Sequence, residues 1–108
     1  MNQYKMSNFS LIIPTYNRPN RLRRLLDYHN KYGKNFKIII GDTSTDENKL
    51  QNKKNISVFS NLDILYLDHY SSKVNPFHKF ADMVNYVKKK YCVLCVDGDF
   101  IILNGINQ

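Results

Sequence analysis

The sequence lacks the features that mark membrane-spanning proteins and secreted, disulfide-bonded proteins. Its first apolar run, residues 9–13, is interrupted by Pro14, so it is too short for a signal-peptide core or a membrane span. Only two cysteines are present, Cys92 and Cys95, and a spacing of three places them on opposite faces of a strand. We therefore interpret both as buried packing residues and expect a cytoplasmic protein.

The two common glycine-rich phosphate-binding signatures are also absent. Neither G-x-G-x-x-G nor G-x-x-x-x-G-K-[ST] occurs, which argues against the usual dinucleotide-binding and P-loop classes. No internal repeat, low-complexity tract or linker interrupts the chain. With 108 residues, of which 43% are hydrophobic and 23% charged, the composition predicts a single domain with an ordinary core over residues 1–108.

Basic residues outnumber acidic residues, and this excess limits the kinds of partner to expect. The formal net charge is +7, from 16 lysines and arginines against 9 aspartates and glutamates. Such a balance favours anionic partners, which include nucleotide phosphates, nucleic acid and an anionic membrane surface. Charge alone does not choose among these three.

Four short apolar runs rich in β-branched residues recur along the chain, with helical spacing between them. The runs do not alternate polar with apolar residues, as is typical of parallel strands covered on both faces. They span residues 9–14, 36–40, 64–67 and 91–96. The alternation of strand and helix predicts an α/β fold with right-handed crossovers.

The helical segments differ in the strength of their patterns. Leu22, Leu25 and Leu26 share one stripe of a helix that Gly33 should end. Asn75 and Pro76 suit the cap and first turn of another helix, in which Phe77, Phe80, Ala81, Val84 and Val87 repeat at helical spacing. Residues 46–55 fit a short polar helix and a surface loop equally well.

Polar side chains follow the end of every predicted strand. In open α/β sheets, ligands bind at the carboxyl edge of the strands. Asp42, after the second strand, could accept hydrogen bonds from a ribose or a base, or could cap the next helix in competition with Thr45 or Asp46. Asp97 and Asp99 follow the fourth strand as D-G-D, which suits a Mg²⁺ or Mn²⁺ site on a phosphate and equally a solvated turn.

Three stretches, taken together, resemble the amino-terminal half of family 2 glycosyltransferases with the GT-A fold. They are LIIPTYNRPNRLRRLLDY, KIIIGDTSTD and FHKFADMVNYVKKKYCVLCVDGDFI, in this order and at this spacing. The resemblance covers residues 9–102. It implies a Rossmann-like fold with a mostly parallel four-stranded sheet, in the order 3-2-1-4, and flanking helices.

The resemblance also implies an activity and a set of site residues. Such enzymes bind a nucleotide-diphosphate sugar and transfer the sugar to a hydroxyl of an acceptor, which can be a glycan or a lipid-linked molecule. A bound Mn²⁺ or Mg²⁺ stabilises the nucleoside-diphosphate leaving group. The donor-binding positions are Pro14, Thr15, Tyr16, Asn17, Arg18, Asp42, Lys79 and Asp97, and the metal ligands are Asp97 and Asp99.

Members of that family continue beyond the D-x-D motif, and their general base lies in the continuation. We therefore expect a half-domain that is truncated after D-x-D, with the general base beyond Gln108 and its own transferase activity left open. With the order 3-2-1-4, the apolar fourth strand would form an exposed sheet edge. Such an edge invites pairing with another chain, so an oligomer is one expectation.

Two alternative functions fit parts of the sequence. One is a phosphoryl-transfer domain that uses aspartates at a strand end, which covalent labelling by a small phosphodonor would reveal. The other is a basic α/β module that binds nucleic acid or an anionic membrane surface, for which binding should weaken steeply with salt. Few aromatic residues accompany the basic ones, so we consider nucleic acid a less favoured partner than the sugar donor. Peripheral contact with the inner face of the membrane is compatible with the glycosyltransferase and with the basic module.

Overall fold

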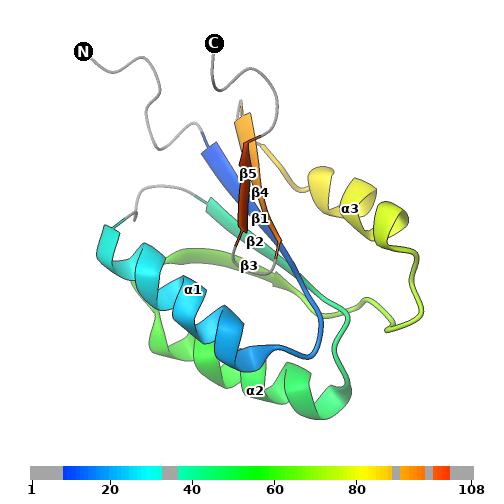
Figure 1. Ribbon diagram of the computed structural model, residues 1–108, viewed down its shortest axis with the longest axis horizontal. Coiled ribbons are helices and arrows are strands. Elements are labelled where there is room, and N and C mark those ends of the chain that lie inside the picture. Colours follow the sequence, from blue (N-terminus) through cyan, green and yellow to red (C-terminus); the bar gives the residue numbers. More distant parts are fainter. Residues whose placement is uncertain (1–8, 33–36, 89–90, 97–98, 103–108) are drawn as a thin grey trace.

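The computed structural model describes residues 9–32, 37–88, 91–96 and 99–102. Within these ranges, the side chains of Phe9, Tyr32, Tyr91, Val96 and residues 99–102 are not described. Figure 1 shows a twisted sheet with helices on both faces, as the sequence predicts for this fold class. None of the helices in the described part of the chain is long and apolar enough to cross a membrane.

The sheet has the order β3-β2-β1-β4-β5. The first four strands in the chain are parallel, which confirms the predicted order 3-2-1-4. The fifth strand is antiparallel to β4. The strands are β1 (Phe9–Thr15), β2 (Lys37–Asp42), β3 (Asp63–Leu67), β4 (Tyr91–Val96) and β5 (Asp99–Ile102).

The expectation that the fourth strand forms a sheet edge is wrong. Strand β5 pairs with β4 from Val96 opposite Asp99 to Val93 opposite Ile102. Its sequence, DFII, is rich in residues that favour strands. The hydrogen-bonding edge of β4 is therefore covered by the chain itself, and β5 and β3 are the outer strands.

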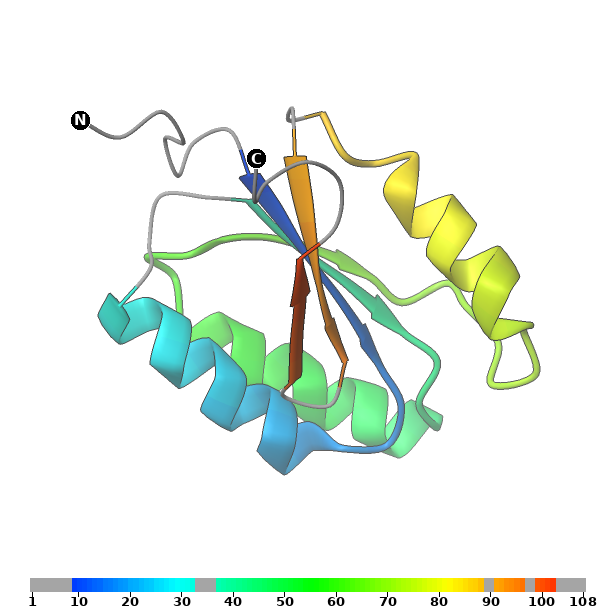
Figure 2. The ribbon, with the colours of Figure 1, turned by 45° about the horizontal axis from the view of Figure 1, so that its top comes forward.

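Helices α1 (Pro19–Tyr32) and α2 (Asp46–Val58) cover one face of the sheet, and α3 (Pro76–Val84) covers the other. Figure 2 shows α1 and α2 side by side below the strands, with α3 separate from them. Residues 46–55, for which the sequence left helix and loop open, lie within α2. Thr45 caps this helix by accepting a hydrogen bond from the amide of Asn48.

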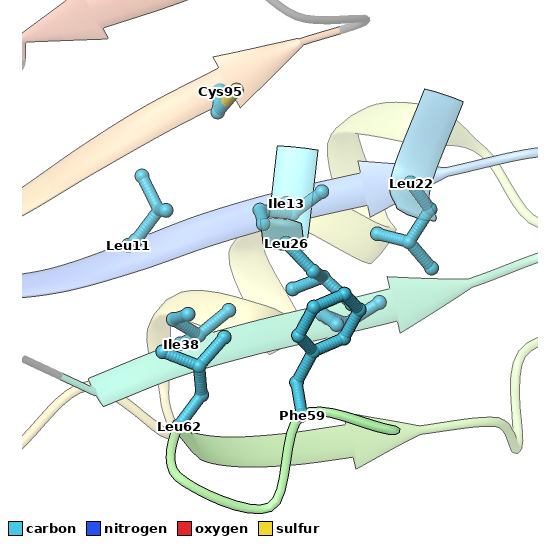
Figure 3. Packing of buried hydrophobic residues seen from close by; sticks show 9 residues of the cluster. Leu11, Ile13, Leu22, Leu26, Ile38, Phe59, Leu62 and Cys95 are labelled. Atoms are coloured by element: carbon cyan, nitrogen blue, oxygen red, sulfur yellow. The ribbon is translucent and has the colours of Figure 1, made fainter. Parts of the chain in front are cut away.

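Two apolar clusters form the core, one on each face of the sheet. Ile38 and Ile40 of β2 lie in the cluster under α1 and α2, whereas Ile39 lies in the cluster under α3. Figure 3 shows Leu22 and Leu26 of α1 among the strand residues of the first cluster. The uninterrupted apolar runs are therefore strands covered on both faces, as predicted.

The two cysteines follow the same alternation along β4. Cys95 is fully buried in the cluster under α1 and α2, where Figure 3 labels it. Cys92 is buried in the cluster under α3. Their placement on opposite faces confirms that they are packing residues that cannot act as a pair.

Helix α3 approaches β2 closely because Gly41 has no side chain. A Cβ atom at this position would lie 2.4 Å from Sδ of Met83, which is fully buried in α3. Real Cβ atoms do not come so close to another atom, so the glycine lets the methionine of α3 rest directly on the end of β2.

Candidate ligand-binding cleft

A cleft of about 790 Å³ opens between α3 and the carboxyl ends of the central strands. This is the edge at which open α/β sheets bind ligands. The residues that line it come from β1 and the loop after it, the end of β2, the loop before α3, α3 itself and β4. They are Pro14, Thr15, Tyr16, Arg18, Thr43, Ser72, Val74, Pro76, Phe77, Lys79, Phe80 and Leu94.

Two basic residues line the cleft, the exposed Arg18 and the buried Lys79, and only 6% of the surface of Lys79 is exposed. Its ammonium donates hydrogen bonds to the carbonyl oxygen of Thr15, at 3.3 Å, and to Oγ1 of Thr43, at 3.2 Å. Both acceptors are neutral. The ammonium therefore has no carboxylate among these hydrogen-bond acceptors and lies next to a largely apolar cleft, which is a suitable arrangement for an anionic ligand.

Burial changes the acid–base behaviour of this lysine. Desolvation lowers the pKa of Lys79 from its ordinary value of 10.5 to about 8, although the nearby charge of Asp42 opposes the change and that of Lys49 adds to it. A group with such a pKa is mostly charged at neutral pH and loses its charge in mildly alkaline solution. An anion that binds here would restore part of the lost solvation.

Two aromatic side chains of the cleft are exposed to solvent. Phe77, in the first turn of α3, is 83% exposed, and Tyr16, in the loop after β1, is 54% exposed. Phe77 belongs to the apolar repeat that predicts this helix, but the packed face of α3 includes Lys79, Phe80 and Met83. The apolar repeat does not coincide with the packed face of α3, because one of the inward positions is occupied by Lys79.

The loop after β1 has an unusual backbone conformation at Asn17. Its φ angle is 51°, in the left-handed region that residues other than glycine seldom adopt. The amide of Asn17 donates to Oγ of Ser44 at 2.7 Å, and its side-chain oxygen accepts from the amide of Thr45 at 2.9 Å. These bonds join the loop to the segment between β2 and α2.

Asp42 ends β2 below the cleft and is fully buried. One carboxylate oxygen accepts from the amide of Ser44 at 2.8 Å. The other accepts from the side-chain amide of Asn52 at 2.7 Å and from the hydroxyl of Tyr66 at 2.5 Å. Burial, followed by this hydrogen bond, raises the pKa of the Tyr66 hydroxyl, so Tyr66 remains a donor to the carboxylate.

The loop between β3 and α3, residues 68–75, forms one wall of the cleft through Ser72 and Val74. Lys49 of α2 fixes the start of this loop, since its ammonium donates to the carbonyl oxygens of Asp68 and Tyr70, each at 2.8 Å. The hydroxyl of Tyr70 donates to Asp82 of α3. The wall is thus attached to α2 at one end and to α3 further along.

A second set of contacts strengthens both attachments. Lys53 of α2 forms an ion pair with Asp68 at 2.9 Å, and this contact lowers the pKa of the Asp68 carboxyl. Nε2 of His69 lies 3.6 Å from the carboxylate of Asp82, which also accepts from Tyr70. We infer that the loop has a defined position in the absence of a ligand.

The predicted donor-binding residues divide into three groups. Five of them line the cleft together, namely Pro14, Thr15, Tyr16, Arg18 and Lys79. Asn17 and Asp42 are directed into the protein, where they organise the surrounding loops. Asp97 lies outside the described residues, and the side chain of Asp99, the first residue of β5, is also outside the description.

The assignment of these residues to a donor and a metal therefore stays a prediction. Among the side chains that the structure describes, no three histidine, cysteine or acidic groups gather into a metal site. No sequence pattern indicated that Phe77, Phe80, Ser72 or Val74 would line the cleft. Thr43 is different, because it belongs to the run of polar residues after the second predicted strand, and such residues were expected at the ligand-binding edge.

Comparisons with known proteins identify the fold at the level of structure. No protein-family model and no curated protein matches the sequence. A mannosyltransferase from Pyrobaculum calidifontis, PcManGT, in complex with GDP-Man and Mn²⁺, matches with a TM-score of 0.73 and 17% identity, over 89% of this chain and 28% of that chain.

Two structures of TarS from S. aureus also match, both at 24% identity. The structure of TarS residues 1–349 has a TM-score of 0.63 and covers 85% of this chain and 28% of that one. The longer TarS structure has a TM-score of 0.62 and covers 84% of this chain and 16% of that one. The chain thus spans less than a third of each of these proteins, and it has a glycosyltransferase-like α/β fold.

Proposed function

We propose that this chain is the donor-binding part of a glycosyltransferase and that its cleft binds a nucleotide-diphosphate sugar. The observation that supports this most strongly is the position of Lys79, a buried ammonium with only neutral hydrogen-bond acceptors, among four other predicted donor residues. A diphosphate is the anionic part of such a donor. The likeness to PcManGT, which was solved in complex with GDP-Man, agrees with this ligand class.

The cleft offers complementary groups for the other parts of the donor. The exposed ring faces of Tyr16 and Phe77 suit a planar base or the apolar face of a sugar. Hydroxyl groups of Thr43 and Ser72, which also line the cleft, suit the polar edges of the same ligand. In this proposal Lys79 and Arg18 attract the phosphates, and the aromatic side chains orient the uncharged parts.

The residue types after β4 fit a divalent cation. Leu94 of β4 lines the cleft, and the backbone of Asp99 pairs with Val96 at the end of the same strand. The backbone of Asp99 therefore lies at the carboxyl end of β4, the edge of the sheet at which the cleft opens. Carboxylates are the hard oxygen ligands that Mn²⁺ and Mg²⁺ prefer, so Asp97 and Asp99 would hold the ion.

When bound, such an ion would neutralise the charge that develops on the diphosphate leaving group. The residues of this chain would bind the donor, orient it and keep a positive charge at Lys79. Transfer to an acceptor hydroxyl also requires a general base. We assign none among the described residues, so glycosyl transfer is proposed for the protein of which this chain forms the donor-binding part.

Calorimetric titration with UDP, GDP, ADP and CDP, each with and without Mn²⁺, tests the proposed function. We expect at least one nucleoside diphosphate to bind, with an affinity that depends on the metal and is lost in Asp99→Asn. Asp63→Asn is the matched control, since Asp63 is an exposed aspartate at the opposite end of the sheet, and it should bind as the wild type does. Binding that is absent for all four ligands, or that does not change when Mn²⁺ is removed, would contradict the proposal.

A further inference from the structure

Helix α2 places three asparagines on one face, at a spacing of four and then three residues. Asn48, Asn52 and Asn55 are separated in this way in the sequence, and residues at such spacings share a side of a helix. Each side-chain amide donates a hydrogen bond to a different segment near the cleft. We call these three residues the asparagine stripe.

The three acceptors all belong to segments that shape the cleft. Nδ2 of Asn48 donates to the side-chain oxygen of Asn17 at 2.9 Å. Nδ2 of Asn52 donates to Asp42 at 2.7 Å, and Nδ2 of Asn55 donates to the carbonyl oxygen of Pro19 at 3.0 Å. One face of α2 therefore contacts the loop after β1, the end of β2 and the start of α1.

The stripe takes the position that apolar residues occupy in most amphipathic helices. Asn52 and Asn55 are buried, whereas Leu50 and Val58 of the same helix are exposed. The side-chain oxygen of Asn52 is buried and has no hydrogen-bond partner among the described residues, which costs stability. A helix selected for stability alone would place apolar side chains here, so the stripe points to a requirement for hydrogen bonding.

The contact between Asn48 and Asn17 has the most direct consequence for the cleft. Asn17 adopts the left-handed conformation, which costs free energy for a residue with a side chain. Its neighbours on both sides, Tyr16 and Arg18, line the cleft, but neither Asn17 nor Asn48 does. The backbone angle at Asn17 therefore determines the direction of two cleft-lining residues, and Asn48 stabilises that angle from outside the cleft.

We propose that the asparagine stripe is a positioning device for the ligand-binding loop, and that Asn48 is a positioning residue that stabilises Asn17 in its left-handed conformation. The proposal rests on the proposed function, because a nucleoside diphosphate is the ligand whose binding reports it. Without the amide of Asn48, the side-chain oxygen of Asn17 keeps the amide of Thr45 as a donor, and the amide of Asn17 keeps Ser44 as an acceptor, but residues 16–18 leave the left-handed arrangement more often in the unliganded protein. The ligand must then select the competent one, and its apparent affinity falls.

The test is a double-mutant cycle between positions 48 and 17, read out as the dissociation constant for the nucleoside diphosphate that binds most tightly in the presence of Mn²⁺. Alanine favours a helix more than asparagine does, so Asn48→Ala should leave the unfolding midpoint nearly unchanged. Its affinity should fall by about tenfold, the range expected when one hydrogen bond in a contacting pair is lost. Ser57→Ala is the control: Ser57 is an exposed polar residue of α2 outside the stripe, its hydroxyl donates to the carbonyl oxygen of Lys54 in the same helix, and the affinity of this variant should not change.

Repeating Asn48→Ala in an Asn17→Gly variant shows whether the loss of affinity arises from the conformation of residue 17. Glycine adopts positive φ angles without the support of a neighbour, so Asn48→Ala should have little additional effect on affinity in this background. An equal loss in both backgrounds, or no loss in either, would overturn the proposal. If the wild type binds none of the nucleoside diphosphates, the proposed function fails, and the positioning role must be tested without a ligand. Crystal structures of the wild type and of Asn48→Ala then serve as the test. A left-handed Asn17 that is unchanged in the variant would also overturn the positioning role.

Discussion

The ammonium of Lys79 lies 3.2 Å from Oγ1 of Thr43, so a buried cation of α3 is joined directly to the carboxyl end of β2. The same ammonium reaches the carbonyl oxygen of Thr15 at the end of β1. One side chain therefore connects a helix with two central strands at the edge where this fold places its ligands. An ammonium in this position is expected to contribute more to binding than to folding.

Replacement of Lys79 by methionine should separate these two contributions. Lys79→Met removes a buried charge that has no carboxylate within its hydrogen-bonding contacts, so we expect an unchanged or higher unfolding midpoint. The affinity for a nucleoside diphosphate should fall by at least about tenfold, because a charge-assisted bond to phosphate is lost. Thermal unfolding and calorimetry measure the two effects. A large loss of stability with unchanged affinity would assign Lys79 to the core instead.

The lowered pKa of Lys79 predicts opposite pH dependences for stability and binding. Between pH 8 and 10.5 the unfolded chain keeps the proton that the folded chain has released, so the contribution of this residue to stability rises with pH. Affinity for a diphosphate should fall as the pH rises above about 8, because the ammonium loses its charge. Both trends should be absent in Lys79→Met, and a flat binding profile in the wild type from pH 7 to 10 would refute the assignment.

A methyl group at Gly41 should displace α3. The added carbon of Gly41→Ala would lie 2.4 Å from Sδ and 2.9 Å from Cε of Met83, in a fully buried contact. We expect a loss of about 1–3 kcal/mol in the free energy of unfolding, as for other overpacked cores. Chemical denaturation measures this, and Met83→Ala should relieve part of the overpacking when combined with Gly41→Ala. If the two substitutions cost the sum of their separate effects, α3 does not depend on this contact.

Phe77 should matter for the ligand and not for the fold. Since its side chain is 83% exposed, Phe77→Ser should change the unfolding free energy by no more than about 0.5 kcal/mol. Stacking on an aromatic ring contributes about 1–3 kcal/mol per base, so the affinity for a nucleoside diphosphate should fall several-fold while that for pyrophosphate stays the same. Leu50→Ser, at an exposed apolar residue outside the cleft, is the control. Equal losses for both ligands would exclude stacking.

Much of the fold could be predicted from short-range patterns. The continuous apolar runs, such as Ile38 to Ile40, predicted strands covered on both faces, and the two clusters of the core confirm this. Helix α2 could not be predicted with the same certainty, because its attachment depends on hydrogen bonds from Asn48, Asn52 and Asn55 and not on an apolar stripe. The pairing of β5 with β4 was missed because its four residues gave too short a pattern.

The site was predictable in part. The polar residues after the strands pointed to the edge at which the cleft opens, and the family resemblance selected Lys79, whose burial no local pattern indicates. The inward direction of Asn17 and Asp42 could not be predicted, since it depends on partners such as Ser44 and Tyr66 that the folded chain brings together. The exposure of Phe77 could not be predicted either, because an apolar residue at helical spacing usually packs inward.

A map of the binding site by NMR would show whether the cleft beside Lys79 binds a nucleotide-diphosphate sugar. The isotopically labelled chain would be titrated with the tightest-binding nucleoside diphosphate in the presence of Mg²⁺. We expect the largest chemical-shift changes on Thr15, Tyr16, Thr43, Phe77 and Lys79. Changes confined to the exposed basic side of α1, at Arg21, Arg24 and Lys31, would contradict this expectation and favour a basic binding module.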